Sequence, residues 1–518
     1  MKAITSLGLV FLLLMPQAES QAADANSSKP NIVLFLVDDM GWQDTSVPFH
    51  TELTAQNRRY HTPNMERLAK IGVKFTQAYA CSICSPTRVS LMTGLNAARH
   101  RVTNWTLKKN ASNDRGHPKL AFPKWNVNGL SPKAGIERTV HAKALPAFLH
   151  DAGYRTIHVG KAHFGAIGTP GTDPRNVGFD VNIAGHAPGG PGSFLGTQNF
   201  SAAWRKASRI WDVPGLEKYH GKDIFLTEAL SIEANRAMDQ AVADGKPFFL
   251  YMSHYAVHVP FAKDSRFYQK YRDAGVGHTE AMYAAMVEGM DKSLGDILNN
   301  VRRHGLSDKT VVLFMSDNGG LSAVGRGGKR HAHNRPLSSG KGSAHEGGVR
   351  VPMMAHWPGV TKAGSVCSQP VIIEDFFSTI LELAGVSNIK QVGGAIDGRS
   401  FVSLLRGKHD KSREDRPLIW HVPNNWGPRG PGIGPSSSIR QGDWKLIYYH
   451  ENRSYELFNL AEDLGERDNL ADKRSEVRDR LAAELGKYLR SVDAQMPTVK
   501  ATGKTVPFPG RPNNNAGQ

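Results

Sequence analysis

Cysteine is scarce in this chain, which has only Cys81, Cys84 and Cys367 among its 518 residues. A small exported scaffold held by disulfides needs many more, so the sequence excludes that class. After the amino terminus there is no apolar run long enough to cross a bilayer, and there is no internal repeat. The length suffices for one large α/β domain and a smaller one.

The amino terminus predicts a signal peptide, residues 1–23. Lys2 is followed by the apolar run Leu9–Met15, which is too short to span a membrane. Cleavage is expected near Ala22-Ala23. We therefore expect export to the periplasm or the medium, or to a lysosome-like compartment if the source is eukaryotic.

Four apolar runs predict strands that are buried on both faces of a parallel sheet. They are Asn31–Val37, Tyr154–Val159, Pro247–Met252 and Thr310–Met315. In open α/β sheets, ligands bind beyond the carboxyl ends of such strands. The residues that follow each run are therefore the first candidates for chemistry.

Acids and an amide follow two of these runs, as Asp38-Asp39 and Asp317-Asn318. Three carboxylates and one amide oxygen form a donor set suited to Ca²⁺, with Mg²⁺ possible. No cysteine or histidine belongs to this set, which argues against zinc. Each pair alone could equally be a turn at a strand end.

Cys84 begins the pattern Cys-x-Pro-x-Arg, which runs to Arg88 and continues as Leu91-Met-Thr-Gly94. Two other interpretations of the cysteine remain open here. It could be an ordinary buried cysteine in a proline turn, or Cys81 and Cys84 could form a redox Cys-x-x-Cys pair.

The long pattern resembles the signature of the type I, formylglycine-dependent sulfatases of the alkaline phosphatase superfamily. Further segments are similar to that family: residues 30–41, 61–69, 160–165, 340–352 and 455–470. Departures from the family pattern are Leu95, Ala162, Phe164 and Ser338. Residues 60–105 also look similar to secreted bacterial polysaccharide sulfatases.

The resemblance implies a Cα-formylglycine nucleophile made from Cys84 by a formylglycine-generating or sulfatase-maturating enzyme. It implies a Ca²⁺ site formed by Asp38, Asp39, Asp317, Asn318 and the modified Cys84. The other catalytic residues that it implies are Arg88, Lys161, His163, His258, Asp317 and Lys341.

The expected fold is α/β: a large, mostly parallel sheet sandwiched by helices, alkaline phosphatase-like, over residues 29–392. Helices are expected at Glu280–His304 and Glu374–Ala384. A C-terminal α+β subdomain with an antiparallel sheet is expected over 393–497, with strands Leu418–His421 and Trp444–Tyr449 and helix Ser475–Ser491. Residues 498–518 are expected to be a loose tail.

The formal net charge is +17, and losing Lys2 and Glu19 with the signal leaves it unchanged. A basic surface suits an anionic partner, although solubility alone is another explanation. No nucleic-acid-binding module is recognisable, so a sulfated carbohydrate is the expected partner. The oligomeric state stays open.

Several polar residues are candidate sugar contacts, and residues 165–205 are a candidate binding loop. The contacts are His186, His331, His333, Arg335 and His421, with Arg175 as a similar candidate and Trp426 as a stacking ring. Two other functions remain open: hydrolysis of phosphate mono- or diesters in the same superfamily, and binding of sulfated glycans without catalysis.

Overall fold

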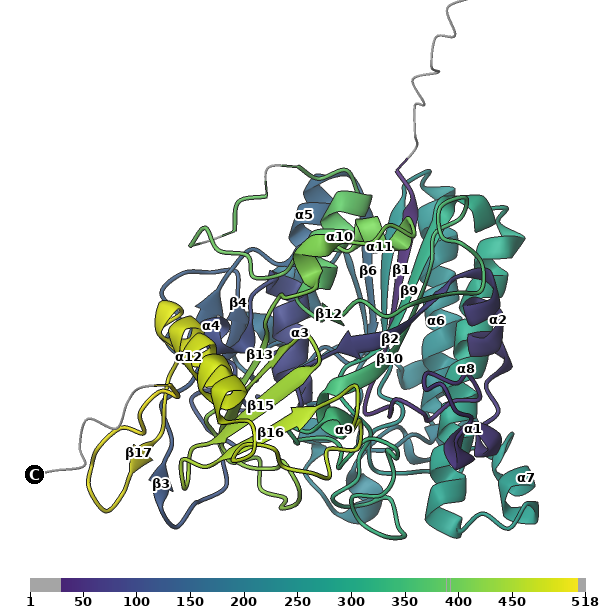
Figure 1. Cartoon of the computed structure of the whole chain (residues 1–518). Helices are drawn as coiled ribbons and strands as arrows, with labels where there is room; N and C mark the ends of the chain where they lie inside the picture. Colours follow the sequence, from purple (N-terminus) through teal and green to yellow (C-terminus); the bar gives the residue numbers. More distant parts are fainter. Residues whose placement is uncertain (1–28, 388, 392, 511–518) are drawn as a thin grey trace, which may run out of the picture.

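The computed structural model describes residues 29–387, 389–391 and 393–510. The predicted signal peptide lies outside them. The centre of the fold is a mostly parallel sheet in the order β11-β2-β10-β9-β1-β8-β6-β7, with β12 paired to β2 (Figure 1). Its strands are β1 (Asn31–Val37), β2 (Val73–Tyr79), β6 (Arg155–Gly160), β7 (Val181–Ile183), β8 (Phe248–Ser253), β9 (Thr310–Ser316), β10 (Arg350–His356), β11 (Ser365–Cys367) and β12 (Val371–Ile372). Strand β10 runs antiparallel to both of its neighbours.

Strand β1 is apolar at every position after Asn31 because helices cover both faces of the sheet (Figure 1). Its Leu34 packs in the core that holds α3 (Cys84–Thr93), α5 (Leu145–Asp151) and α10 (Asp375–Leu383). Its Phe35 points the other way, toward α2 (Pro63–Ile71), α6 (Leu226–Ala243) and α8 (His278–Arg303). The predicted fold class is confirmed.

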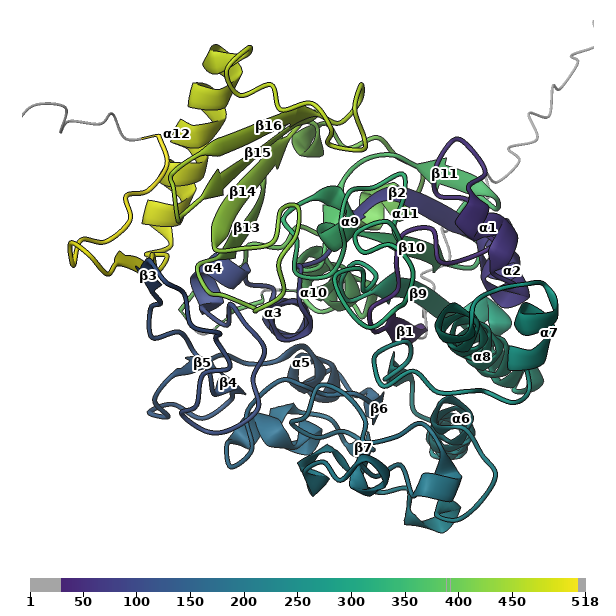
Figure 2. The same ribbon diagram turned by 90° about the horizontal axis from the view of Figure 1, so that it is seen from below.

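The C-terminal part adds a four-stranded antiparallel sheet covered by a helix (Figure 2). It consists of β13 (Leu418–Val422), β14 (Ser436–Gln441), β15 (Trp444–Tyr449), β16 (Tyr455–Asn459) and α12 (Ser475–Ser491). Residues 498–510, expected to be loose, instead contain β17 (Thr498–Val499), which pairs with β3 (Leu120–Ala121). Backbone hydrogen bonds to another part of the chain hold this segment, and composition alone did not reveal them.

The remaining α-helices and strands are short, and several 3-10 turns lie between the elements. These short helices and strands are α1 (Ala55–Arg59), α4 (Ala97–His100), α7 (Tyr268–Asp273), α9 (Glu346–Val349), α11 (Val402–Leu405), β4 (Gly129–Ser131) and β5 (Thr139–His141). Among the helices of the described residues, none has the length and apolarity needed to cross a membrane.

Gly160 ends β6 at a point where the chain leaves no room for a side chain. Its φ is 98°, and a Cβ would lie 1.9 Å from the carbonyl oxygen of Ser253 on β8. Because both the left-handed backbone and the clash add cost, we expect Gly160→Ala to lower the free energy of unfolding by about 2–5 kcal/mol in a denaturant titration. Gly153→Ala is the control, since its φ is 89° but a Cβ meets no described atom within 4 Å. Equal losses in the two variants would contradict the steric argument.

Candidate active site

Parallel pairing of β1 and β9 brings the four predicted oxygen donors together. The register sets Val37 opposite Ser316, so the next residues on the two strands lie side by side. All four donors are fully buried or nearly so: Asp38, Asp39, Asp317 and Asn318. The sequence prediction of one acidic cluster at this edge of the sheet therefore agrees with the geometry.

This cluster fits a hard divalent cation. Oxygens of Asp38, Asp39 and Asp317 lie within 4.8 Å of one another and of the Cys84 sulfur. The Oδ2 of Asp39 and the Oδ1 of Asn318 are buried and have no hydrogen-bond partner among the described residues. Since buried polar atoms are normally paired, these oxygens are suited to coordinate Ca²⁺.

Cys84 is the first residue of α3, and its Sγ lies 3.7 Å from Oδ1 of Asp38. One helical turn later, Arg88 donates from Nε and Nη2 to Oδ2 of Asp317, at 3.0 and 2.8 Å. The i, i+4 spacing of the motif thus aligns both side chains on one helix face, where Arg88 balances a buried carboxylate.

The two predicted lysines pair with the two acids of β1. Lys161 Nζ lies 2.6 Å from Oδ2 of Asp38, and Lys341 Nζ lies 2.6 Å from Oδ1 of Asp39. Burial raises the pKa of Asp38, and the Asp317 carboxylate adds to this. Burial also opposes ionisation of Asp39, but Lys341, His258 and Lys161 together outweigh it, and the pKa of Asp39 falls below its usual range.

The two predicted histidines are held as neutral rings beside these charges. His163 Nε2 lies 3.0 Å from the Thr106 carbonyl oxygen, and His258 Nδ1 lies 2.7 Å from the Val259 carbonyl oxygen. Burial lowers the pKa of both, that of His258 to about 3, with Lys341 contributing to the shift of His258. His258 Nε2 faces Asp39 Oδ2 at 3.8 Å.

A cavity of about 550 Å³ opens onto these groups, and we call it the active-site cavity. Cys84, His163, His258 and Lys341 line it. The predicted binding loop enters through Gly189-Gly190, where a Cβ on Gly189 would lie 2.3 Å from Cε1 of His163. The backbone of this loop therefore packs directly against the two predicted histidines, His163 and His258.

The lining of the active-site cavity also contains residues that sequence reasoning missed. These are Trp105, Asn113, Arg115 and Trp211. Trp426, the predicted stacking ring, lines the same cavity. Aromatic residues and an Arg in predicted loops were the available signal for these contacts. Tryptophan alone does not indicate a binding surface, because many tryptophans pack in protein cores.

The other candidate sugar contacts are not among the residues that line this cavity, although His186 contacts one of them. The His186 carbonyl oxygen accepts the His163 backbone N–H at 3.2 Å. His421 is buried between Ser437 and the Gln495 carbonyl oxygen. His331 approaches Gly430, His333 lines a second cavity, Arg335 is exposed, and Arg175 pairs with Asp173.

The redox interpretation of Cys81 and Cys84 finds no support in their surroundings. Both are free thiols, and burial raises the pKa of each to about 12. A redox-active pair requires the opposite, a stabilised thiolate.

Comparison with known proteins agrees with this geometry. Residues 30–386 match the family model described as Sulfatase, and residues 340–495 match the model described as N-sulphoglucosamine sulphohydrolase, C-terminal. The chain therefore belongs to the sulfatase family. It is a sulfuric ester hydrolase with an alkaline phosphatase-like fold.

Relatives match along nearly the whole chain. It is 31% identical to a sulfatase of Formosa agariphila, over 95% of this chain and 94% of that one. It is 31% identical to N-acetylgalactosamine-6-sulfatase of Mus musculus, over 87% and 78%. A solved structure of Ps i-CgsB in complex with k-i-k-neocarrahexaose is similar with TM-score 0.69 and 27% identity, covering 89% and 93%.

If the four donors bind Ca²⁺, adding the ion should raise the melting temperature, because a ligand that binds only the folded state stabilises it. The stabilisation is about 2.7 kcal/mol when the free ligand concentration is a hundred times Kd. Asn318→Ala removes one unpartnered oxygen and should weaken the Ca²⁺ dependence, measured by differential scanning fluorimetry. Glu382→Ala, an exposed acid on α10, is the control. Identical Ca²⁺ titrations for Asn318→Ala and the control would rule out this ligand.

Proposed function

We propose that the protein hydrolyses sulfate esters of a sulfated carbohydrate, using formylglycine made from Cys84 and a bound Ca²⁺. The observation that carries this proposal is the position of Cys84. Its Sγ lies 3.7 Å from Oδ1 of Asp38, and Cys84 lines the active-site cavity together with Lys341 and His258. We further propose that a maturation enzyme modifies Cys84 and that the chain is exported to the periplasm or the medium.

Residue 84 needs modification because its thiol is a poor nucleophile in this setting. Burial raises the pKa of the Cys84 thiol to about 12, so little thiolate exists near neutrality. Oxidised to formylglycine and hydrated, residue 84 supplies one hydroxyl that attacks sulfur and a second whose deprotonation expels sulfate. Bound Ca²⁺ supplies Lewis-acid polarisation of a sulfate oxygen.

Cationic side chains are placed to receive the sulfate group. Lys161 pairs with Asp38 and Lys341 pairs with Asp39, and in the proposal both lysines bind the sulfate oxygens together with His258. Their charge balances the negative charge that develops on these oxygens in the transition state. Asp317, oriented by Arg88, accepts the proton of the attacking hydroxyl.

Two proton transfers remain, and the histidine geometry suits them. His163 directs Nε2 at the Thr106 carbonyl oxygen, and its buried Nδ1 has no partner among the described residues. A ring that donates from Nε2 keeps a basic Nδ1, so His163 removes the proton of the second hydroxyl. His258 or Lys341 protonates the departing alcohol oxygen.

Carbohydrate is the substrate class that the cavity and the relatives favour. Trp105, Trp211 and Trp426 line the active-site cavity, and flat aromatic rings with a polar edge suit the faces of sugars. The similar proteins include an N-acetylgalactosamine-6-sulfatase and a structure that holds a neocarrahexaose. We therefore propose a galactose- or N-acetylgalactosamine-type sugar.

Substitutions of the two neighbouring cysteines separate their roles. Cys84→Ser should lose multiple turnover, because a sulfated serine has no second hydroxyl on the same carbon, and Cys84→Ala should lose all turnover. Cys81→Ser should keep most activity, since Cys81 lies outside the cavity lining. The measurement is sulfate release, with mass analysis of the Cys84 peptide from the native host. An unmodified Cys84 in active enzyme would contradict the formylglycine proposal.

A substrate screen tests the ester and the sugar together. Sulfate release should be fastest from sulfated galactans or galactosaminoglycans and slower from a simple aryl sulfate. Phosphate release from the matched aryl phosphate should be slower than both. Turnover of the aryl sulfate with no release from any saccharide would contradict the carbohydrate assignment alone. Faster phosphate than sulfate release would contradict the sulfatase assignment.

A further inference from the structure

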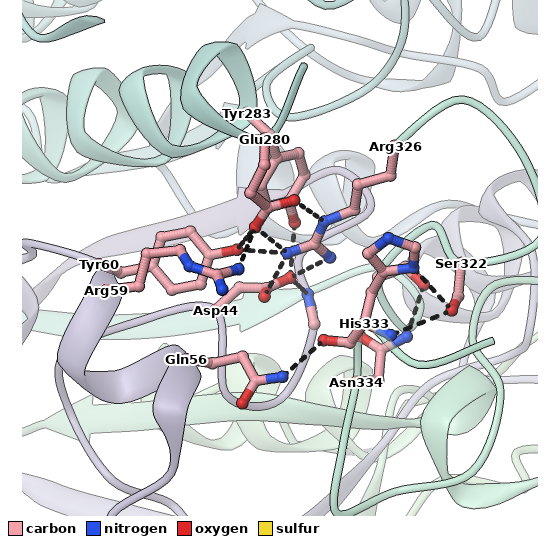
Figure 3. A network of polar contacts seen from close by, with 12 residues as sticks. Asp44, Gln56, Arg59, Tyr60, Glu280, Tyr283, Ser322, Arg326, His333 and Asn334 are labelled. Carbon is pink, nitrogen blue, oxygen red and sulfur yellow. Dashed lines mark hydrogen bonds and ion pairs between the residues drawn. The ribbon is translucent and has the colours of Figure 1, made fainter. Parts of the chain in front are cut away.

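A second, larger cavity of about 880 Å³ lies between α1, the start of α8 and the loop of residues 322–334. We call it the distal basic cavity. Side chains of Arg58, Arg59, Lys329 and His333 line it. Figure 3 shows its inner wall, where Arg59 and Gln56 of α1 face Glu280 of α8 and His333 of the loop. Nothing in the proposed reaction uses these residues.

The charge of this cavity is positive and largely uncompensated. Its one acid, Glu280, is neutralised by Arg59 at 2.9 Å and by the buried Arg326 at 3.1 Å. Arg58 and Lys329 are exposed, and no ion pair or hydrogen bond joins their charged groups to another described residue. Arg330, which follows Lys329 in the chain, is likewise exposed and unpaired among the described residues. Helix α8 adds its positive end, because it starts after Gly277 without a side-chain cap.

A smaller cavity of about 350 Å³ shares lining residues with both the active-site cavity and the distal basic cavity. Val324 and Gly325 line both the active-site cavity and the small one. Arg326 and Gly327, the next residues, line both the small cavity and the distal basic cavity. The segment Val324–Gly327 therefore adjoins all three cavities, and it is the stretch that a chain-like ligand reaching from Cys84 to the basic cluster would follow.

A buried network holds the loop in place (Figure 3). Arg326 donates to both oxygens of Asp44, at 3.0 and 2.8 Å, and its guanidinium lies 3.8 Å from the ring centre of Tyr283. Asp44 also accepts the backbone N–H of Gly41 at 2.9 Å, close to the metal motif. Arg326 therefore anchors the loop to the segment that follows Asp38 and Asp39.

We infer that the distal basic cavity binds anionic sugar units of the same polysaccharide whose sulfate lies at Cys84. This inference rests on the proposed function and deepens it. Sulfate or carboxylate groups on neighbouring units meet Arg58 and Lys329 in this cavity and Arg330 in the adjoining small one. These side chains suit such groups because their charges are free. The enzyme then prefers chains long enough to fill both cavities over single sugars or disaccharides.

The test compares ligands of two lengths in the Cys84→Ala background, where binding is measured without turnover. The probes are disaccharides and hexasaccharides prepared from chondroitin 6-sulfate and from κ-carrageenan, titrated by calorimetry. The hexasaccharide should bind at least about tenfold more tightly than its disaccharide, and the difference should shrink as salt rises. A variant with Arg58→Ser, Lys329→Ser and Arg330→Ser should lose most of that length preference.

The matched control removes the same charge elsewhere: Lys362→Ser, Lys408→Ser and Lys473→Ser, three exposed lysines without ion pairs in the described residues. The length preference should survive in it. Equal affinity for both lengths, or equal losses in the two triple variants, would overturn the inference. The proposed function fails by a different result, namely no sulfate release by the unsubstituted enzyme from any of these saccharides.

Discussion

The in-register parallel pairing of β1 with β9 is the constraint on which the active site depends. It places Asp38, Asp39 and Asp317 together in the protein interior, where three carboxylates repel one another strongly. Arg88, Lys161 and Lys341 supply three buried positive charges against them. With all three carboxylates ionised these six charges cancel. A divalent cation would then keep Asp38 ionised despite its raised pKa and would give the site a net positive charge, which suits the anionic sulfate ester and the charge that builds up during its cleavage.

The sequence predicted this part of the molecule well because strand ends are local signals. Two apolar runs determine the site once their strands are neighbours in the sheet. One run ends in Asp38-Asp39 and the other in Asp317-Asn318. The cysteine motif likewise lies on one helix, where the i, i+4 spacing places Cys84 and Arg88 on the same face. Periodicity and spacing carry such information without tertiary contacts.

The sequence predicted the outer parts poorly because they consist of loops from distant segments. The distal basic cavity combines residues near 58, 280 and 329, and no periodic pattern connects these positions. His421 had a plausible polar context, yet hydrogen bonds to Ser437 and the Gln495 carbonyl oxygen hold it within the C-terminal subdomain. Composition predicts that a loop is polar, but it does not predict the direction in which the side chains of the loop point.

The C-terminal subdomain has a positional role in the same electrostatic scheme. Lys445 of β15 is fully buried and lies 2.9 Å from Glu346 and 3.0 Å from Glu466. Glu346 begins α9, five residues after Lys341. A buried cation between two carboxylates adds little net stability, because desolvation offsets the attraction. It does specify one geometry, however, so this cluster joins β15 to the segment that carries Lys341. The ammonium group that faces Asp39 is thus fixed from two sides, by the main sheet through Asp39 and by the second sheet through Lys445.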